Sequence, residues 1–172
     1  VFKIVGLQKG VDRAAAVSMM IMPKGTIFIC DTHVNPGPSA EEIARFTLLA
    51  ASTVRRFGIE PKVAALSHSN FGSSQNKNAK KMRDAVDKIR ALDGSLEIDG
   101  EMHSDAALSQ DMRDVLVFDS KLSGRANLLI MPSLDAANIT FNALRMLADG
   151  VAVGPMLVGM AQPAHVVQET VT

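Results

Sequence analysis

The chain has no tryptophan or tyrosine, a single cysteine, Cys30, and no net charge, because 18 Lys and Arg balance 18 Asp and Glu over 172 residues. One cysteine excludes an internal disulfide framework and favours a reducing compartment, so we expect a cytoplasmic protein. Without an excess of cations, the chain lacks the electrostatic footprint of a nucleic-acid binder. Its Cys and His residues show no zinc-site spacing, and we expect no metal site.

Long hydrophobic runs are also missing. The longest, residues 14–23 and 151–161, contain Pro or Gly and fall short of the roughly 20 residues that cross a bilayer, so we expect no membrane association. The chain begins with Val and shows no secretory signal, which favours a fragment of a longer polypeptide. With 47% hydrophobic residues, residues 1–172 should nevertheless form one domain with one core.

Strand-like and helix-like segments alternate along the chain. Short apolar runs predict strands at residues 26–30, 62–67, 96–99 and 127–131. Helical spacing of apolar residues predicts helices at residues 39–57, 77–92, 104–112 and 135–147. We also expect strands at 2–7 and 17–22, and short strands and turns at 151–172. The alternation predicts an α/β fold, with three layers (α/β/α) around a largely parallel sheet.

The loop after the strand at 62–67 is the richest candidate site, because ligands of parallel sheets gather at the carboxyl ends of strands. Ser69, Asn70, Gly72 and Ser73 offer hydroxyl, amide and backbone groups just before a helix, a combination that can bind phosphate or another anion. A polar loop that only caps the helix explains these residues equally well. The lysine of a nucleotide P-loop and the G-x-G-x-x-G of a dinucleotide site are both missing.

An acidic group, Glu97, Asp99, Glu101 and Asp105, surrounds His103. It suggests a metal or an acid and base pair, but a strand end at Asp99 and a helix start at Asp105 explain it better. Cys30 lies in an expected buried strand and is interpreted as a core residue. The residues alone therefore indicate no complete catalytic set.

Four stretches carry a more specific signal: Asp31–Asn35, Ala65–Ser74, Ile98–Leu108 and Val153–Gly159. They closely resemble the phosphotransacetylase-like domain at the C-terminus of large bacterial NADP-dependent malic enzymes. That domain is in turn similar to phosphate acetyltransferases, whose two α/β subdomains enclose a coenzyme A cleft. The chain resembles the second of these subdomains.

The resemblance breaks at two positions that act in catalysis in true acetyltransferases. Gln168 and Glu169 stand where those enzymes carry Ser and Arg. A glutamate in place of an arginine reverses the charge that would stabilise phosphate or an oxyanion. We therefore expect no catalytic residues in this segment.

The resemblance implies a non-catalytic regulatory and oligomerisation domain. In such enzymes acetyl-CoA binds this domain and inhibits malate decarboxylation by a separate domain in the same chain, which uses NADP and a divalent metal. The candidate effector contacts are Ser69, Asn70, Gly72, Ser73, Asp135, Asn138 and Asn142.

Two alternatives stay open. One is an active phosphate acetyltransferase that moves acetyl between coenzyme A and phosphate. The other is a pure self-association module. Whether the domain is regulatory or only self-associates, we expect a dimer or higher homo-oligomer, because a subdomain separated from its neighbour exposes an apolar patch.

Overall fold

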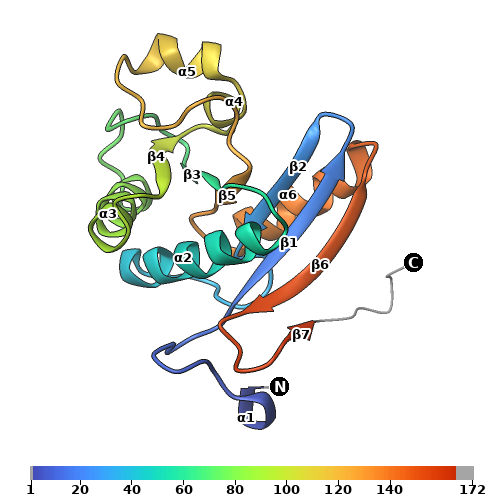
Figure 1. The fold of residues 1–172 in the computed structure, drawn as a ribbon. Coiled ribbons are helices and arrows are strands. Elements are labelled where there is room, and N and C mark those ends of the chain that lie inside the picture. The colour runs from blue at the N-terminus through green and yellow to red at the C-terminus, as the bar shows by residue number, and fades with distance from the viewer. Residues whose placement is uncertain (1, 166–172) are drawn as a thin grey trace.

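The structure is a computed structural model that describes residues 2–165 and the side chains from residue 4 onward (Figure 1). Its strands are β1 (Ala15–Met22), β2 (Gly25–Cys30), β3 (Lys62–Leu66), β4 (Glu97–Met102), β5 (Leu128–Ile130), β6 (Val151–Val158) and β7 (Ala164–His165). Its helices are α1 (Phe2–Val5), α2 (Ala40–Arg56), α3 (Lys77–Leu92), α4 (Ser104–Leu108), α5 (Gln110–Leu116) and α6 (Leu134–Leu147). None of the helices in this part of the chain is long and apolar enough to cross a membrane.

All seven strands form one mixed sheet in the order β4-β3-β5-β2-β1-β6-β7. The neighbours from β4 to β2 run parallel, whereas β1, β6 and β7 add antiparallel pairings. The predicted α/β class is confirmed, and the parallel character is confined to one half of the sheet. Only two residues, Pro23 and Lys24, separate β1 from β2, and a connection that short joins antiparallel neighbours.

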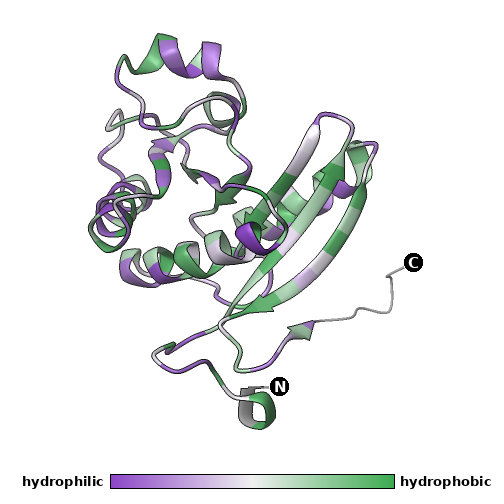
Figure 2. Cartoon of the chain, in the orientation of Figure 1, coloured by the Kyte–Doolittle hydropathy of each residue, from purple (hydrophilic) through white to green (hydrophobic). Residues whose placement is uncertain are grey.

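Helices cover both faces of the sheet, as expected for three layers (Figure 1). One core cluster packs α2 and α3 against the sheet through residues such as Ile43, Val54 and Met82. The opposite cluster holds Met102 of β4 and Phe141 of α6. Apolar residues accordingly dominate the central strands, whereas polar and apolar residues alternate along helices such as α2 and α3 (Figure 2).

The helix boundaries follow from capping chemistry. Ser39 Oγ accepts a hydrogen bond from the Glu42 backbone N–H at 3.2 Å, and Glu42 Oε2 accepts one from the Ser39 N–H at 2.8 Å, which is the predicted capping box. The expected helix over 104–112 is wrong as a single element. Ser109 is extended and its hydroxyl caps α5 through the Met112 N–H, so the chain forms two short helices.

Three strand predictions are also wrong, wholly or in part. Residues 2–5 form the short helix α1, and of the expected strand at 2–7 only an isolated bridge from Leu7 to Met160 is present. The strand predicted to end at Asp99 continues through Gly100 to Met102. Glycine tolerates the φ of 134° at that point, which lets the strand continue after a register shift. Of the short strands and turns expected at 151–172, residues 151–158 form one long strand, β7 is a short strand, and residues 166–172 lie outside the described part of the chain.

Candidate functional site

The loop that leaves β2 is held by a buried carboxylate. Asp31 Oδ1 accepts hydrogen bonds from the backbone N–H groups of Ala16 at 2.9 Å and of His33 and Val34 at 3.1 Å. Its Oδ2 accepts the N–H of Asn35 at 3.0 Å. Backbone donors that would otherwise be unsatisfied thus converge on one side chain, which fixes the turn at the end of the strand.

This turn places His33 at the end of a hydrogen-bonded chain of hydroxyls. Ser18 Oγ and Thr32 Oγ1 are 2.8 Å apart, and Thr32 Oγ1 is 2.9 Å from His33 Nδ1. Ser18 and Thr32 are both fully buried. Burial lowers the pKa of His33, and the nearby Asp31 charge opposes that shift only in part. The hydrogen bond between His33 Nδ1 and Thr32 Oγ1 orients the imidazole ring.

A cavity of about 350 Å³ opens beside His33, between α6 and β6. We call it the α6 cavity; its polar lining is His33, Asn138, Asn142 and Arg145, and its apolar lining includes Phe141, Val151 and Pro155. Two predicted contacts, Asn138 and Asn142, are therefore brought together here. Asn138 Nδ2 donates to the Thr32 carbonyl at 3.2 Å, and Asn142 Nδ2 donates to Asn138 Oδ1 at 3.0 Å.

Arg145 and His33 were not among the residues predicted from the sequence. Arg145 lies seven residues after Asn138 and three after Asn142, so helical spacing would have placed it on the same face. His33 had no comparable signal, because only the turn around Asp31 brings it to α6. The third predicted residue of this helix, Asp135, is exposed in the first turn and does not line the cavity.

The predicted anion loop lies elsewhere, between β3 and α3. Its donors are turned toward a carboxylate of the chain itself: Ser69 Oγ and the Gly72 N–H both donate to Glu101 Oε1, at 2.5 and 3.1 Å. Asn70 and Ser73 bond to one another, since the Asn70 N–H donates to Ser73 Oγ at 3.0 Å. The structure does not bring this loop into the α6 cavity.

The acidic group around His103 is dispersed among separate partners. Asp99 accepts hydrogen bonds from Arg90 at 2.9 Å and from Ser120 at 2.8 Å. Glu97 accepts from Ser123 Oγ at 2.7 Å. Within residues 2–165, no set of three or more His, Cys, Asp or Glu residues is arranged to hold a metal ion.

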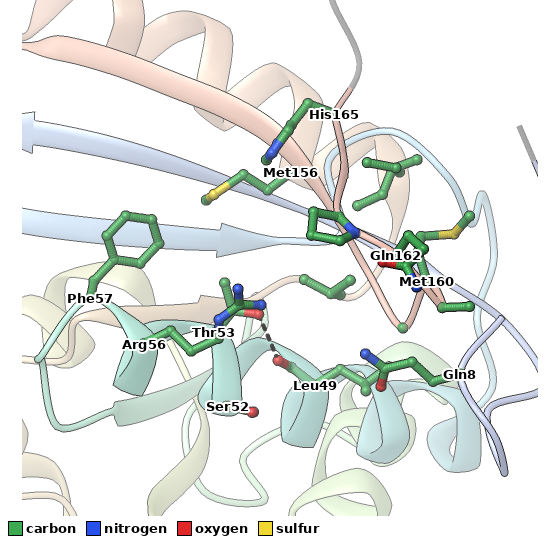
Figure 3. A pocket seen from close by; sticks show the side chains of 16 residues that line it. Gln8, Leu49, Ser52, Thr53, Arg56, Phe57, Met156, Met160, Gln162 and His165 are labelled. Carbon is green, nitrogen blue, oxygen red and sulfur yellow. Dashed lines mark hydrogen bonds between the residues drawn. The ribbon is translucent and has the colours of Figure 1, made fainter. Parts of the chain in front are cut away.

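A second cavity, of about 520 Å³, lies between α2 and the turn from β6 to β7 (Figure 3). Arg56 and His165 contribute polar groups, and Phe57 and Met156 contribute apolar walls. Thr53 also lines this cavity, but its hydroxyl donates a hydrogen bond to the Leu49 carbonyl at 3.0 Å within α2 (Figure 3). The two departures from the acetyltransferase pattern, Gln168 and Glu169, follow shortly after His165 and lie outside the described residues.

The chain belongs to the phosphate acetyl/butaryl transferase family, whose model matches residues 1–172. The fold agrees: an EutD phosphotransacetylase from Staphylococcus aureus superposes with a TM-score of 0.91 at 31% identity, covering 99% of this chain and 53% of that one. The mixed sheet and the helices that cover it are thus the fold of a phosphotransacetylase.

Within this family the chain corresponds to the phosphotransacetylase-like region of bacterial malic enzymes. It is 52% identical to the NADP-dependent malic enzyme of Escherichia coli (strain K12), over 95% of this chain and 22% of that protein. It is 48% identical to the NAD-dependent malic enzyme of Rhizobium meliloti (strain 1021), over 100% of this chain and 22% of that protein. The chain therefore spans about a fifth of the length of these relatives. The phosphate acetyltransferase of Helicobacter pylori (strain J99 / ATCC 700824) is 32% identical over 95% of this chain.

Proposed function

We propose that residues 1–172 are the regulatory and self-association region of an NADP-dependent malic enzyme, that they bind acetyl-CoA as an allosteric inhibitor, and that they catalyse no reaction themselves. The observation that carries this proposal is the α6 cavity, where Arg145, His33 and the amides of Asn138 and Asn142 converge. The similarity to malic enzymes supports the identity of the parent protein.

The chemistry of the cavity suits an acyl-coenzyme A. Arginine and amide groups bind phosphate and carbonyl oxygens, while Phe141 and Pro155 offer apolar contact. The volume of about 350 Å³ lies at the lower end of the range for small-molecule sites, so the cavity holds one end of the ligand. The remainder extends over surfaces that other parts of the protein supply.

Regulation of a distant active site requires that the effector bind one global state more tightly than another. In this proposal the parent enzyme decarboxylates malate to pyruvate in a separate domain that holds NADP and a divalent metal. Acetyl-CoA bound to the α6 cavity favours the less active state. Acetyl-CoA can then shift the equilibrium between the two states by no more than the ratio of its affinities for them.

Calorimetry with acetyl-CoA on the full-length polypeptide tests this role. Arg145→Gln should weaken binding by about 10-fold, the value of one charge-assisted hydrogen bond, and should reduce inhibition of malate decarboxylation while leaving the uninhibited rate unchanged. Arg56→Gln is the matched control, because Arg56 lines the other cavity. Absence of acetyl-CoA binding at millimolar concentration would refute the effector role.

The proposed lack of catalysis rests on Gln168 and Glu169 in the sequence. A glutamate repels the phosphate that an acetyltransferase must bind. A coupled assay with acetyl phosphate and coenzyme A should therefore show no turnover. Turnover that depends on this region would restore the alternative of an active phosphate acetyltransferase.

Self-association is favoured by an exposed apolar face on α5 and the turn after it. Val115 and Phe118 are 87% and 104% exposed, and Met112 and Leu116 are about half exposed, at 47% and 48%. A second copy that covers this face would bury these side chains. In light scattering, Phe118→Asp should have a lower mass than the wild type. The control Leu92→Asp, at an exposed apolar position on α3, should have an unchanged mass. A monomeric wild type at high concentration would contradict self-association.

A further inference from the structure

The 67–74 loop has the donors of an anion site, and those donors surround Glu101. Ser69 Oγ donates to Glu101 Oε1 at 2.5 Å, and the Gly72 N–H donates to the same oxygen at 3.1 Å. Arg83 Nη1, from α3, contacts it at 2.7 Å. A hydroxyl, a backbone N–H and a guanidinium are the groups that also bind phosphates and free carboxylates.

A local irregularity of the sheet brings Glu101 to this position. Ala65 of β3 pairs with Gly100 of β4, but the next residue, Leu66, pairs with Met102, so Glu101 is an extra residue in the ladder. A side chain at Gly100 would place its Cβ 2.6 Å from the Ala65 carbonyl oxygen. The bulge and its glycine thus direct a charged side chain into a fully buried site, where Glu101 is 0% exposed.

The coordination of the Glu101 carboxylate is incomplete. Its second oxygen, Oε2, is buried and has no hydrogen-bond partner within residues 2–165, and the same is true of Ser67 Oγ, at the start of the loop. Buried polar atoms of this kind usually have a partner. Oε1 thus has three donors, whereas Oε2 has none among the described residues. Glu101 therefore occupies the pocket but leaves part of its own hydrogen-bonding capacity unused.

We propose that Glu101 is the resident anion of the 67–74 loop and a specificity-determining residue that excludes external phosphates and carboxylates from it. The loop keeps the conformation of an anion site because an internal carboxylate occupies the place of the ligand. Anionic ligands of this protein are thereby confined to other surfaces, among them the α6 cavity with its arginine. This inference does not rest on the acetyl-CoA proposal.

Removal of the charge should open the loop to an external anion. Glu101→Ser removes the carboxylate and shortens the side chain, so it vacates the space among the donors and leaves Arg83 without its counter-charge. We expect calorimetry with inorganic phosphate on the full-length polypeptide to show at least 10-fold tighter binding to this variant than to the wild type. Adding Arg83→Met to Glu101→Ser should abolish the gain, because it removes the guanidinium of the same site.

Glu101→Ala tests the same site by chemical rescue, because it leaves space for a small carboxylate. Its midpoint of thermal unfolding should rise by about 3 °C in about 100 mM sodium acetate relative to sodium chloride of equal ionic strength, whereas the wild type should not respond. If this variant fails to fold, the Glu101→Ser titration decides alone. A folded Glu101→Ser that binds phosphate no better than the wild type, or a gain that survives Arg83→Met, would overturn the proposal.

Discussion

At the scale of single residues, the protein uses buried carboxylates to shape its loops. Asp31 gathers four backbone N–H groups at the end of β2, and Glu101 gathers Ser69, Gly72 and Arg83 at the end of β3. Both residues lie where strands end, and ligands of α/β proteins bind at such strand ends. Local charge therefore determines which of these loops can still accept an external anion.

Gly100 is the residue on which the position of Glu101 depends. Gly100→Ala would combine a φ of 134° with a Cβ 2.6 Å from the Ala65 carbonyl oxygen. We expect the free energy of unfolding in urea to fall by about 3 kcal/mol. Gly37→Ala is the control: no heavy atom of the described residues lies within 4 Å of the added Cβ there, and φ is not positive, so its effect should stay within about 0.5 kcal/mol. Equal effects at the two glycines would contradict this account.

His33 should give the stability a measurable pH dependence. Its pKa is lowered in the folded state by burial, so between that pKa and the ordinary value of 6.5 the unfolded chain binds more protons than the folded one. Stability should then rise with pH across this window. Thermal unfolding between about pH 5 and pH 7 should show a shallower slope for His33→Gln. A His33→Gln variant that keeps the wild-type slope would show that His33 is not the source of this dependence.

At the scale of elements, the short helices α4 and α5 depend on a buried cation. Arg113 of α5 is 0% exposed and donates to the carbonyls of Ala106, Leu122 and Gly124 at 2.7–2.8 Å. Its Nε also donates to Ser120 Oγ at 3.1 Å. One guanidinium thus connects both helices to the segment that leads into β5.

Arg113→Met should destabilise the protein strongly. The methionine fills much of the space but removes the Arg113 donor from three carbonyls, those of Ala106 and Leu122 in buried hydrogen bonds and that of Gly124 in a partly buried one. Each buried group left unsatisfied costs about 1–3 kcal/mol. We expect urea unfolding to show a loss of more than about 3 kcal/mol. Arg56→Met, at an exposed position, should change stability by less than about 0.5 kcal/mol. A loss below about 1 kcal/mol for Arg113→Met would show that these carbonyls find other partners.

An exposed ion pair joins the two helices on one face of the sheet. Lys88 Nζ of α3 lies 2.8 Å from Glu41 Oε1 of α2, and this hydrogen bond lowers the pKa of Glu41 to about 2. The stabilisation is therefore present above the ordinary pKa of 4.5 and is lost as the pH falls toward 2. The difference in thermal midpoint between wild type and Glu41→Gln should shrink over that range, and at neutral pH should shrink with added salt. A difference independent of both pH and salt would rule out the ion pair as its cause.

Elements with strong local signals could be predicted from the sequence, and those that depend on long-range pairing could not. The capping box at Ser39 and the apolar spacing of α3 identify helices by themselves. Gly100 was interpreted as the end of a strand, because the positive φ that glycine allows occurs at turns and at bulges alike. Ser109 divides a helical pattern through its own cap, which competes with continuation of the helix.

At the scale of the whole molecule, the fold class was predictable because the alternation of strands and helices extends over most of the chain. The site was predictable in part. Asn138 and Asn142 line the α6 cavity together, whereas the loop at Ser69 and Gly72 faces Glu101. No local pattern indicates that a carboxylate some thirty residues away in sequence approaches that loop, since only the pairing of β3 with β4 brings it there.

The α6 cavity takes its walls from distant parts of the chain. His33 follows β2, Asn142 belongs to α6, and Pro155 lies within β6. A ligand that touches all three acts as a non-covalent staple between the first and last thirds of the chain, and it must dissociate before these segments can separate. Occupancy of one small cavity would therefore slow hydrogen exchange across the antiparallel half of the sheet, far beyond the residues that the ligand contacts.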